Sequence, residues 1–138
     1  MNIYIKYILL CILVIILDSI WIFSNSSAYF NGIRKVQNND NVKINLYAAP
    51  LAYLVMIFSL IHIAIPLTQQ HINMRDSILT KIYKSFIYGG AVGFCIYALY
   101  NLTSLAIYKD FPINMAILDT LWGTILYSIV TYSYISLY

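Results

Sequence analysis

Charged side chains are scarce in this chain, and glutamate is absent. Only 9% of the 138 residues are charged, whereas a soluble domain carries about 25% charged residues. So few charges cannot cover a water-facing surface, which excludes a soluble single-domain enzyme. Because 62% of the residues are hydrophobic and 16% are aromatic, a disordered chain is excluded as well. The composition therefore indicates an integral membrane protein.

Motifs that carry chemistry are also scarce. The two cysteines, Cys11 and Cys95, lie inside apolar segments, where small buried side chains are expected rather than a disulfide framework or a zinc site. The eight Lys and Arg residues are spread thinly, so we expect no nucleic-acid partner. The sequence holds no histidine cluster, phosphate-binding loop or nucleophile motif. We expect no catalytic residues, no metal and no cofactor, and an enzyme is the least favoured interpretation.

Four stretches are long and apolar enough to cross a membrane as helices, which takes about 20 residues each. They cover residues 3–24, 46–67, 85–107 and 113–136. Only residues 108–112 separate the last two stretches, so these two helices are expected to be antiparallel neighbours. The sequence predicts an all-α fold, in which residues 1–138 form a single integral membrane domain. Its architecture is a four-helix transmembrane bundle with antiparallel neighbours.

Four spans place both termini on the same side of the membrane. Lys and Arg near the span ends normally mark the cytoplasmic side. Four of them lie on each side: Lys6, Arg75, Lys81 and Lys84 on the side of the termini, and Arg34, Lys35, Lys43 and Lys109 on the other. The count does not decide the orientation, and our working assignment places both termini in the cytoplasm.

Two aspartates, Asp18 and Asp119, lie within the first and the last span. A charge at the bilayer centre costs about 2.5–3.5 kcal/mol on insertion scales, so such residues usually face the bundle interior. Counted from the span ends, Asp18, Asn101 and Asp119 each lie ~9 Å below the surface away from the termini. Tyr53 in the second span lies about one residue deeper. Each helix therefore contributes a polar side chain to one layer.

Three aromatic side chains extend this layer. Trp21 and Trp122 each follow an aspartate by three residues and share its helix face, and an indole N–H is a donor that a carboxylate accepts. Tyr97 lies on a stripe with Gly89 and Gly93, whose spacing lets helices approach closely. The hypothetical ligand-binding polar layer therefore has seven members: Asp18, Trp21, Tyr53, Tyr97, Asn101, Asp119 and Trp122.

This polar layer has two interpretations. It is either a pocket that holds a proton, a cation or a small polar ligand, reached from the connection at residues 25–45, or a structural core whose hydrogen bonds fix the helix packing. If the two carboxylates lie close together, they cannot both ionise easily, and they would share a proton or a cation. The sequence leaves both interpretations open.

Four segments resemble a known family: LDSIW, GIRKVQNNDNVKIN, YNLTSLAIYKDFP and ILDTLWG. The family is domain of unknown function 2177, which consists of small predicted four-helix membrane proteins of bacteria and large DNA viruses, and the chain resembles the viral type more closely. The resemblance covers nearly the whole chain. It implies a four-helix membrane protein and no particular activity. It also implies that relatives commonly carry Asp where this chain has Asn101.

These observations favour a multi-pass membrane protein that is transporter-like or ligand-binding and uses the carboxylate layer as its site. The alternative is a structural or assembly protein, which would be viral if the closer resemblance holds, with no catalytic or transport activity. The expected partners are the lipid bilayer, a second copy of the chain in a homodimer, and a proton, cation or small polar ligand. The expected location is a cell membrane or, for a viral protein, a host or virion membrane.

Overall fold

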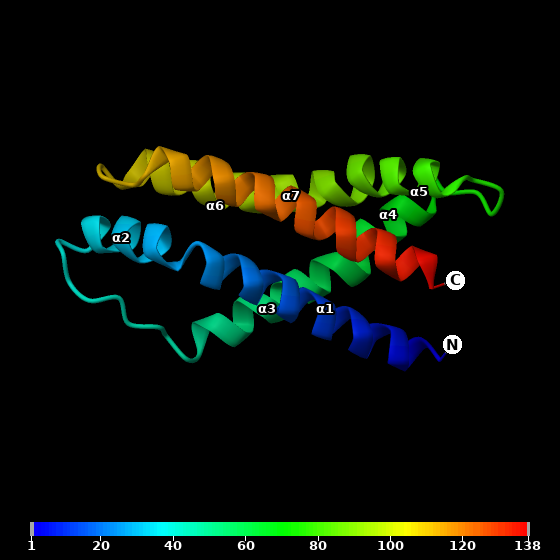
Figure 1. Cartoon of the computed structure of the whole chain (residues 1–138), viewed down its shortest axis with the longest axis horizontal. Coiled ribbons are helices and arrows are strands. Elements are labelled where there is room, and N and C mark those ends of the chain that lie inside the picture. Colours follow the sequence, from blue (N-terminus) through cyan, green and yellow to red (C-terminus); the bar gives the residue numbers. More distant parts are fainter. Residues whose placement is uncertain (1, 138) are drawn as a thin grey trace.

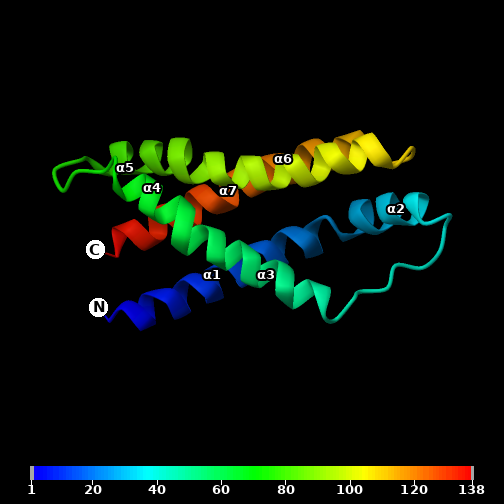
Figure 2. The same cartoon turned by 180° about the vertical axis from the view of Figure 1, so that it is seen from behind.

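Four long helices form an elongated bundle in the computed structural model, which describes residues 2–137 (Figure 1). The helices long and apolar enough to span a membrane cover Ile3–Ser24, Ala48–Gln69, Ile78–Ile107 and Ile113–Ser136. The described residues contain no strand. The all-α class with four membrane-spanning candidates is therefore confirmed. Both termini lie at the same end of the bundle, as Figure 1 and Figure 2 show.

The first span is α1, Ile3–Ser24, and a short helix, α2, Ser26–Val36, follows after a break at Asn25. Figure 1 shows α2 continuing along the direction of α1 toward the tip of the last hairpin. α1 buries a single narrow stripe, made of every fourth residue: Lys6, Leu10, Val14 and Asp18. Tyr7, Leu13 and Leu17 flank this stripe and pack partly against the core, and most of the other apolar side chains are exposed, where lipid would lie. The stripe explains how Asp18 comes to face the bundle interior.

The second span contains α3, Ala48–Ser59, a π-helical turn η1, Leu60–Ala64, and α4, Ile65–Gln69. Because the helix begins at Ala48, Pro50 falls in its first turn, where a missing N–H leaves no helical hydrogen bond unmade. Pro66 lies near the C-terminal end of the span but well beyond its first turn, where a proline removes one backbone bond and clashes with an earlier carbonyl. The wider turn η1 ends at Ala64, two residues before Pro66, and accommodates it within a continuous helix.

The third span contains α5, Ile78–Lys84, a second π-helical turn η2, Ser85–Gly89, and α6, Gly90–Ile107. This span begins seven residues before the expected position 85. The reason is a local cap, since the Ser77 hydroxyl accepts a hydrogen bond from the backbone N–H of Thr80 at 3.2 Å. Ser77 thus starts a helix within the polar connection, before the apolar stretch begins.

The last helix, α7, Ile113–Ser136, packs along α6 at very short range. A Cβ atom on Gly93 would overlap the carbonyl oxygen of Gly123, and one on Gly123 would overlap the ring of Tyr97. A Cβ atom on Gly89 would lie 2.7 Å from the Thr131 hydroxyl. The glycine stripe of α6 therefore faces α7, where it lets the two backbones approach.

A partly buried ion pair organises the turn between α4 and α5. Lys84 Nζ donates to Asp76 Oδ2 at 2.7 Å, and the backbone N–H of Asn73 donates to the same oxygen at 2.9 Å. The hydrogen bond from Lys84, followed by that from Asn73, holds the pKa of Asp76 below its ordinary value. A lowered pKa stabilises the folded turn above about pH 4, and this contribution is lost as the pH falls through the folded-state pKa.

We expect the backbone of residues 72–78 to lose amide-exchange protection, by about two- to fivefold, when wild-type protein is acidified from pH 6 to pH 3. Asp76→Asn removes the charge that Lys84 contacts. The variant should therefore show low protection at both pH values. Protection factors from hydrogen exchange measured by mass spectrometry check this, and an unchanged acid loss in the variant would contradict it.

Candidate functional site

Asp18 is enclosed where α1, α3 and α7 meet. The Tyr53 hydroxyl of α3 donates to Oδ2 of Asp18 at 2.7 Å, and the Trp122 indole N–H of α7 donates to Oδ1 at 3.1 Å. Only 7% of the residue is exposed. A buried carboxylate needs such donors to compensate for lost hydration. Asp18 thereby links its own helix to two others.

Asp119 of α7 also receives two hydrogen bonds, from different elements. The side-chain amide of Asn101 in α6 donates to Oδ2 at 2.9 Å, and the hydroxyl of Tyr29 in α2 donates to Oδ1. Both oxygens therefore act as acceptors, as those of a carboxylate do. Unlike Asp18, Asp119 is only partly buried.

The two tryptophans connect these carboxylates. The rings of Trp21 and Trp122 are stacked, with centroids 4.9 Å apart and planes 4° from parallel. The indole N–H of Trp21 donates to the Tyr29 hydroxyl at 3.0 Å. Trp21 therefore donates to Tyr29 and not to Asp18 of its own helix. Trp122 likewise donates to Asp18 of α1 and not to Asp119 of its own helix. The contacts run from Asp18 through both indoles and Tyr29 to Asp119.

Tyr29 is the site residue that the sequence analysis missed. Asp18, Trp21, Asn25 and Tyr29 recur at intervals of three and four residues, a pattern that becomes visible only when the helical face is continued past Asn25. Burial, followed by the hydrogen bond to Asp119, raises the pKa of Tyr29. The hydroxyl therefore keeps its proton at neutral pH and remains a donor.

Asn101 is oriented by its surroundings. Its amide nitrogen donates to three oxygens: the Tyr97 carbonyl at 2.9 Å, Asp119 Oδ2 at 2.9 Å and the Thr120 hydroxyl at 3.3 Å. Its Oδ1 is buried and has no hydrogen-bond partner among the described residues. An ionised aspartate at this position has no N–H to donate. The amide thus supplies a donor where the resemblance implies a carboxylate in relatives.

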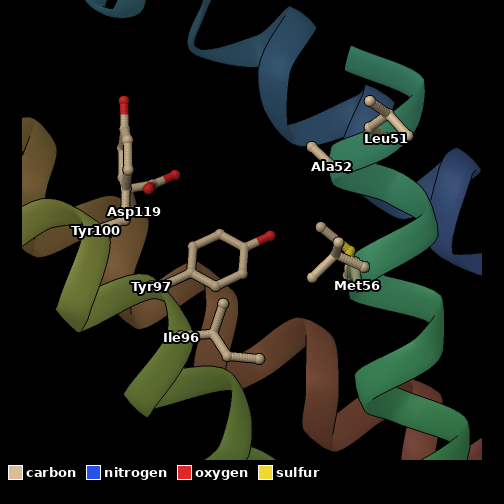
Figure 3. Close-up of a pocket in the computed structure, with 8 residues that line it drawn as sticks. Leu51, Ala52, Met56, Ile96, Tyr97, Tyr100 and Asp119 are labelled. Carbon is tan, nitrogen blue, oxygen red and sulfur yellow. The ribbon is translucent and has the colours of Figure 1, made fainter. Parts of the chain in front are cut away.

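A cavity of about 480 Å³ lies between α3 and α6, with Asp119 in its wall (Figure 3). Tyr97 adds a second polar group, and Figure 3 shows its ring reaching from α6 into the space in front of α3. The other lining residues are Leu51, Ala52, Val55, Met56, Ile96 and Tyr100. Side chains at the rim are largely exposed, at 60% for Leu51 and 64% for Val55. The cavity therefore opens sideways, toward the lipid.

The structure brings the seven residues of the sequence-derived layer into one connected cluster, but the two aspartates differ in access. Asp119 lines the cavity, and Asp18 does not. Each carboxylate has its own donors, and no hydrogen bond joins them. Across residues 2–137, no three His, Cys, Asp or Glu side chains gather to ligate a metal. The site is thus built around one accessible carboxylate and one enclosed one.

Comparison with known proteins agrees with this architecture. Neither a curated protein nor a solved structure matches the chain. A family model described as "Predicted membrane protein (DUF2177)" matches residues 3–135. The match includes every residue of the polar cluster and all of the four spans except Ser136. The chain therefore belongs to the DUF2177 family of predicted membrane proteins.

Proposed function

We propose that this membrane protein is a small transporter-like, ligand-binding protein whose binding group is the carboxylate of Asp119. The observation that carries the proposal is the difference in access between two chemically identical side chains. Asp119 lines a cavity of about 480 Å³, whereas Asp18 is enclosed by Tyr53 and Trp122. A purely structural carboxylate has no need of an open cavity beside it.

The hydrogen bonds around Asp119 leave it able to bind a ligand. A carboxylate has about four lone-pair sites, and Tyr29 and Asn101 occupy two of them. No Lys, Arg or His of the described chain forms an ion pair with Asp119. Its charge is therefore available to a cation or to a polar group that donates hydrogen bonds.

Asp119→Asn tests this proposal. The amide can still accept a hydrogen bond from Tyr29, and it can donate to the unpartnered Oδ1 of Asn101 once that side chain rotates. We therefore expect the variant to fold, with its affinity for methylammonium reduced about ten- to hundredfold, since a hydrogen bond to a charged group contributes about 1.5–3 kcal/mol. Titration calorimetry of the protein in nanodiscs, and methylammonium uptake into proteoliposomes, measure the loss.

Asp18→Asn is the matched control, because it makes the same chemical change at a carboxylate that does not line the cavity. We expect this variant to bind methylammonium like the wild type. Equal losses of binding in both variants would reject Asp119 as the binding group. Absence of binding of both methylammonium and a larger primary ammonium to the wild type would reject the proposal as a whole.

The second candidate is a structural or assembly protein, of viral type or acting as a homodimer, whose polar cluster only fixes the packing. It is favoured by one observation: the two carboxylates accept hydrogen bonds from α2, α3, α6 and α7. This candidate predicts comparable destabilisation by Asp18→Asn and Asp119→Asn in SDS-induced unfolding. It also predicts no effect of methylammonium on the unfolding midpoint of the wild type.

A further inference from the structure

We infer that the ligand of this site is an amphipathic organic cation, a primary amine carrying one apolar body, that enters from the lipid phase between α3 and α6. The inference rests on the proposed function and names its ligand class. It joins three features of the molecule: an accessible carboxylate, aromatic rings beside it, and an apolar cavity that opens sideways.

The carboxylate selects the charge of the ligand. Within residues 2–137, Lys84 and Asp76 form an ion pair in a polar turn. No Lys, Arg or His of these residues forms an ion pair with Asp119. Tyr29 and Asn101 donate to Asp119 as neutral groups, so the cluster keeps a net negative charge when Asp119 is ionised. A primary ammonium brings one positive charge and three N–H donors. It therefore matches both the charge of Asp119 and its remaining acceptor sites.

The aromatic rings favour a cation over a neutral donor. Tyr97 and Tyr100 line the cavity together with Asp119, and Figure 3 shows the Tyr100 ring beside the carboxylate and the Tyr97 ring reaching toward α3. Ring faces attract an ammonium, more strongly where water is excluded. A cation held at Asp119 would therefore lie among groups that favour positive charge.

The rest of the cavity requires an apolar body. Leu51, Val55, Met56 and Ile96 line the space between α3 and α6, and no second charged side chain lines it. A small hydrated cation would leave these surfaces without apolar contact. A hydrocarbon body attached to the amine would fill the space and bury its own apolar surface.

The direction of access points to the lipid. On the side of residues 25–45, Tyr29 covers Asp119, and the cavity beside it measures only about 150 Å³ and does not include Asp119 among its lining residues. On the α3–α6 side, the wider cavity reaches Asp119, and Tyr100 at its rim is 61% exposed. An amine dissolved in the bilayer thus meets the open side of the site.

Three probes separate the effect of the ligand's charge on binding from the effect of its apolar body. The full chain in phosphatidylcholine nanodiscs is titrated with 4-phenylbutylammonium, its neutral analogue 4-phenyl-1-butanol, and methylammonium. We expect 4-phenylbutylammonium to bind at least about tenfold more tightly than methylammonium, because of the added apolar body. It should also bind at least about tenfold more tightly than the alcohol, because of the charge. Asp119→Asn should remove the preference over the alcohol.

Ala52→Phe tests the location of the apolar body. Ala52 lines the cavity from α3, across the space from Asp119, and a phenyl group at this position would occupy the part of the cavity next to α3 (Figure 3). We expect this variant to lose about tenfold or more in affinity for 4-phenylbutylammonium and to keep its affinity for methylammonium. Ala91→Phe, on an exposed part of α6 outside the cavity, is the matched control and should leave both affinities unchanged.

The outcomes distinguish this inference from the proposed function. If methylammonium binding depends on Asp119 but the phenylbutyl group adds nothing, the ligand class is wrong and the proposed function stands. If no probe depends on Asp119, both are wrong. Equal binding of the alcohol and the amine would overturn the cationic ligand. Displacement of the amine by phosphatidylethanolamine added to the nanodiscs would overturn a free amine in favour of a lipid headgroup.

Discussion

Gly93→Ala is expected to destabilise the folded protein by about 3 kcal/mol, the upper range for overpacking of a well-packed interior. The added Cβ atom would overlap the carbonyl oxygen of Gly123 and would lie 2.7 Å from the Cβ of Tyr127. The oxygen belongs to a helix backbone and cannot rotate away, so α6 and α7 would have to separate. SDS-induced unfolding in mixed micelles measures the change.

Gly90→Ala provides the comparison three residues away, nearly one helical turn, from the tight contact at Gly93. A Cβ atom at Gly90 would meet the Ser128 hydroxyl at 2.5 Å, and this hydroxyl can move by rotation of its side chain. Replacing glycine by alanine also favours the helix by about 0.8–1.0 kcal/mol. We therefore expect Gly90→Ala to remain within about 1 kcal/mol of the wild type. Equal unfolding midpoints for the two variants would show that the α6–α7 contact is looser than described.

Asp18→Ala is expected to destabilise the protein by about 2–3 kcal/mol, because it removes two hydrogen bonds and leaves two donors without partners. The donors are the Tyr53 hydroxyl and the Trp122 indole N–H, which reach Asp18 from α3 and α7. Hydrogen bonds between membrane helices contribute about 0.6 kcal/mol each on average, so much of the effect comes from the unpaired donors. The same SDS unfolding measurement checks the value.

A double-mutant cycle with Tyr53→Phe isolates the hydrogen bond itself. In the wild-type background, Tyr53→Phe removes one donor to Asp18 and should cost about 0.6–1.7 kcal/mol. In the Asp18→Ala background, it removes an unpaired hydroxyl and should cost nothing or stabilise the protein. Additive effects would mean that the two side chains do not interact in the folded protein.

Hydropathy and helix length predicted the architecture well, because a lipid environment imposes a simple requirement on each span. Residues 3–24 and 113–136 coincide with α1 and α7. The third span was harder to delimit because Ser77 begins the helix among polar residues, where hydropathy gives no signal. The π-helical turns η1 and η2 could not be predicted from the spacing of apolar and polar residues, since their segments are mostly apolar and have no distinct polar face.

Counting residues from the span ends placed the polar side chains at one level, and the structure joins them through contacts between helices. The same counting says nothing about direction around each helix axis. It therefore could not show that Trp122 reaches Asp18, or that only Asp119 borders the cavity. Tyr29 was not predicted as a site residue because it lies after the first span, yet its hydroxyl donates to Asp119. A count along the sequence predicts the depth of a side chain, whereas the pairing of side chains depends on how the helices rotate and cross.

The Tyr29–Asp119 hydrogen bond has a thermodynamic consequence for the aqueous segment that carries it. Gly32 is the one buried residue of α2, against Pro112 and Met115, and the Trp21 indole adds a hydrogen bond to Tyr29, so few contacts hold α2 to the bundle. Any antibody or partner that prefers α2 detached will uncover one oxygen of Asp119. The coupling is reciprocal: a ligand that competes with Tyr29 for this oxygen will favour the detachment of α2. It will do so by the same free energy by which detachment of α2 favours binding of the ligand. If Asp119 binds a ligand as proposed, its occupancy would change how firmly α2 is held against the bundle.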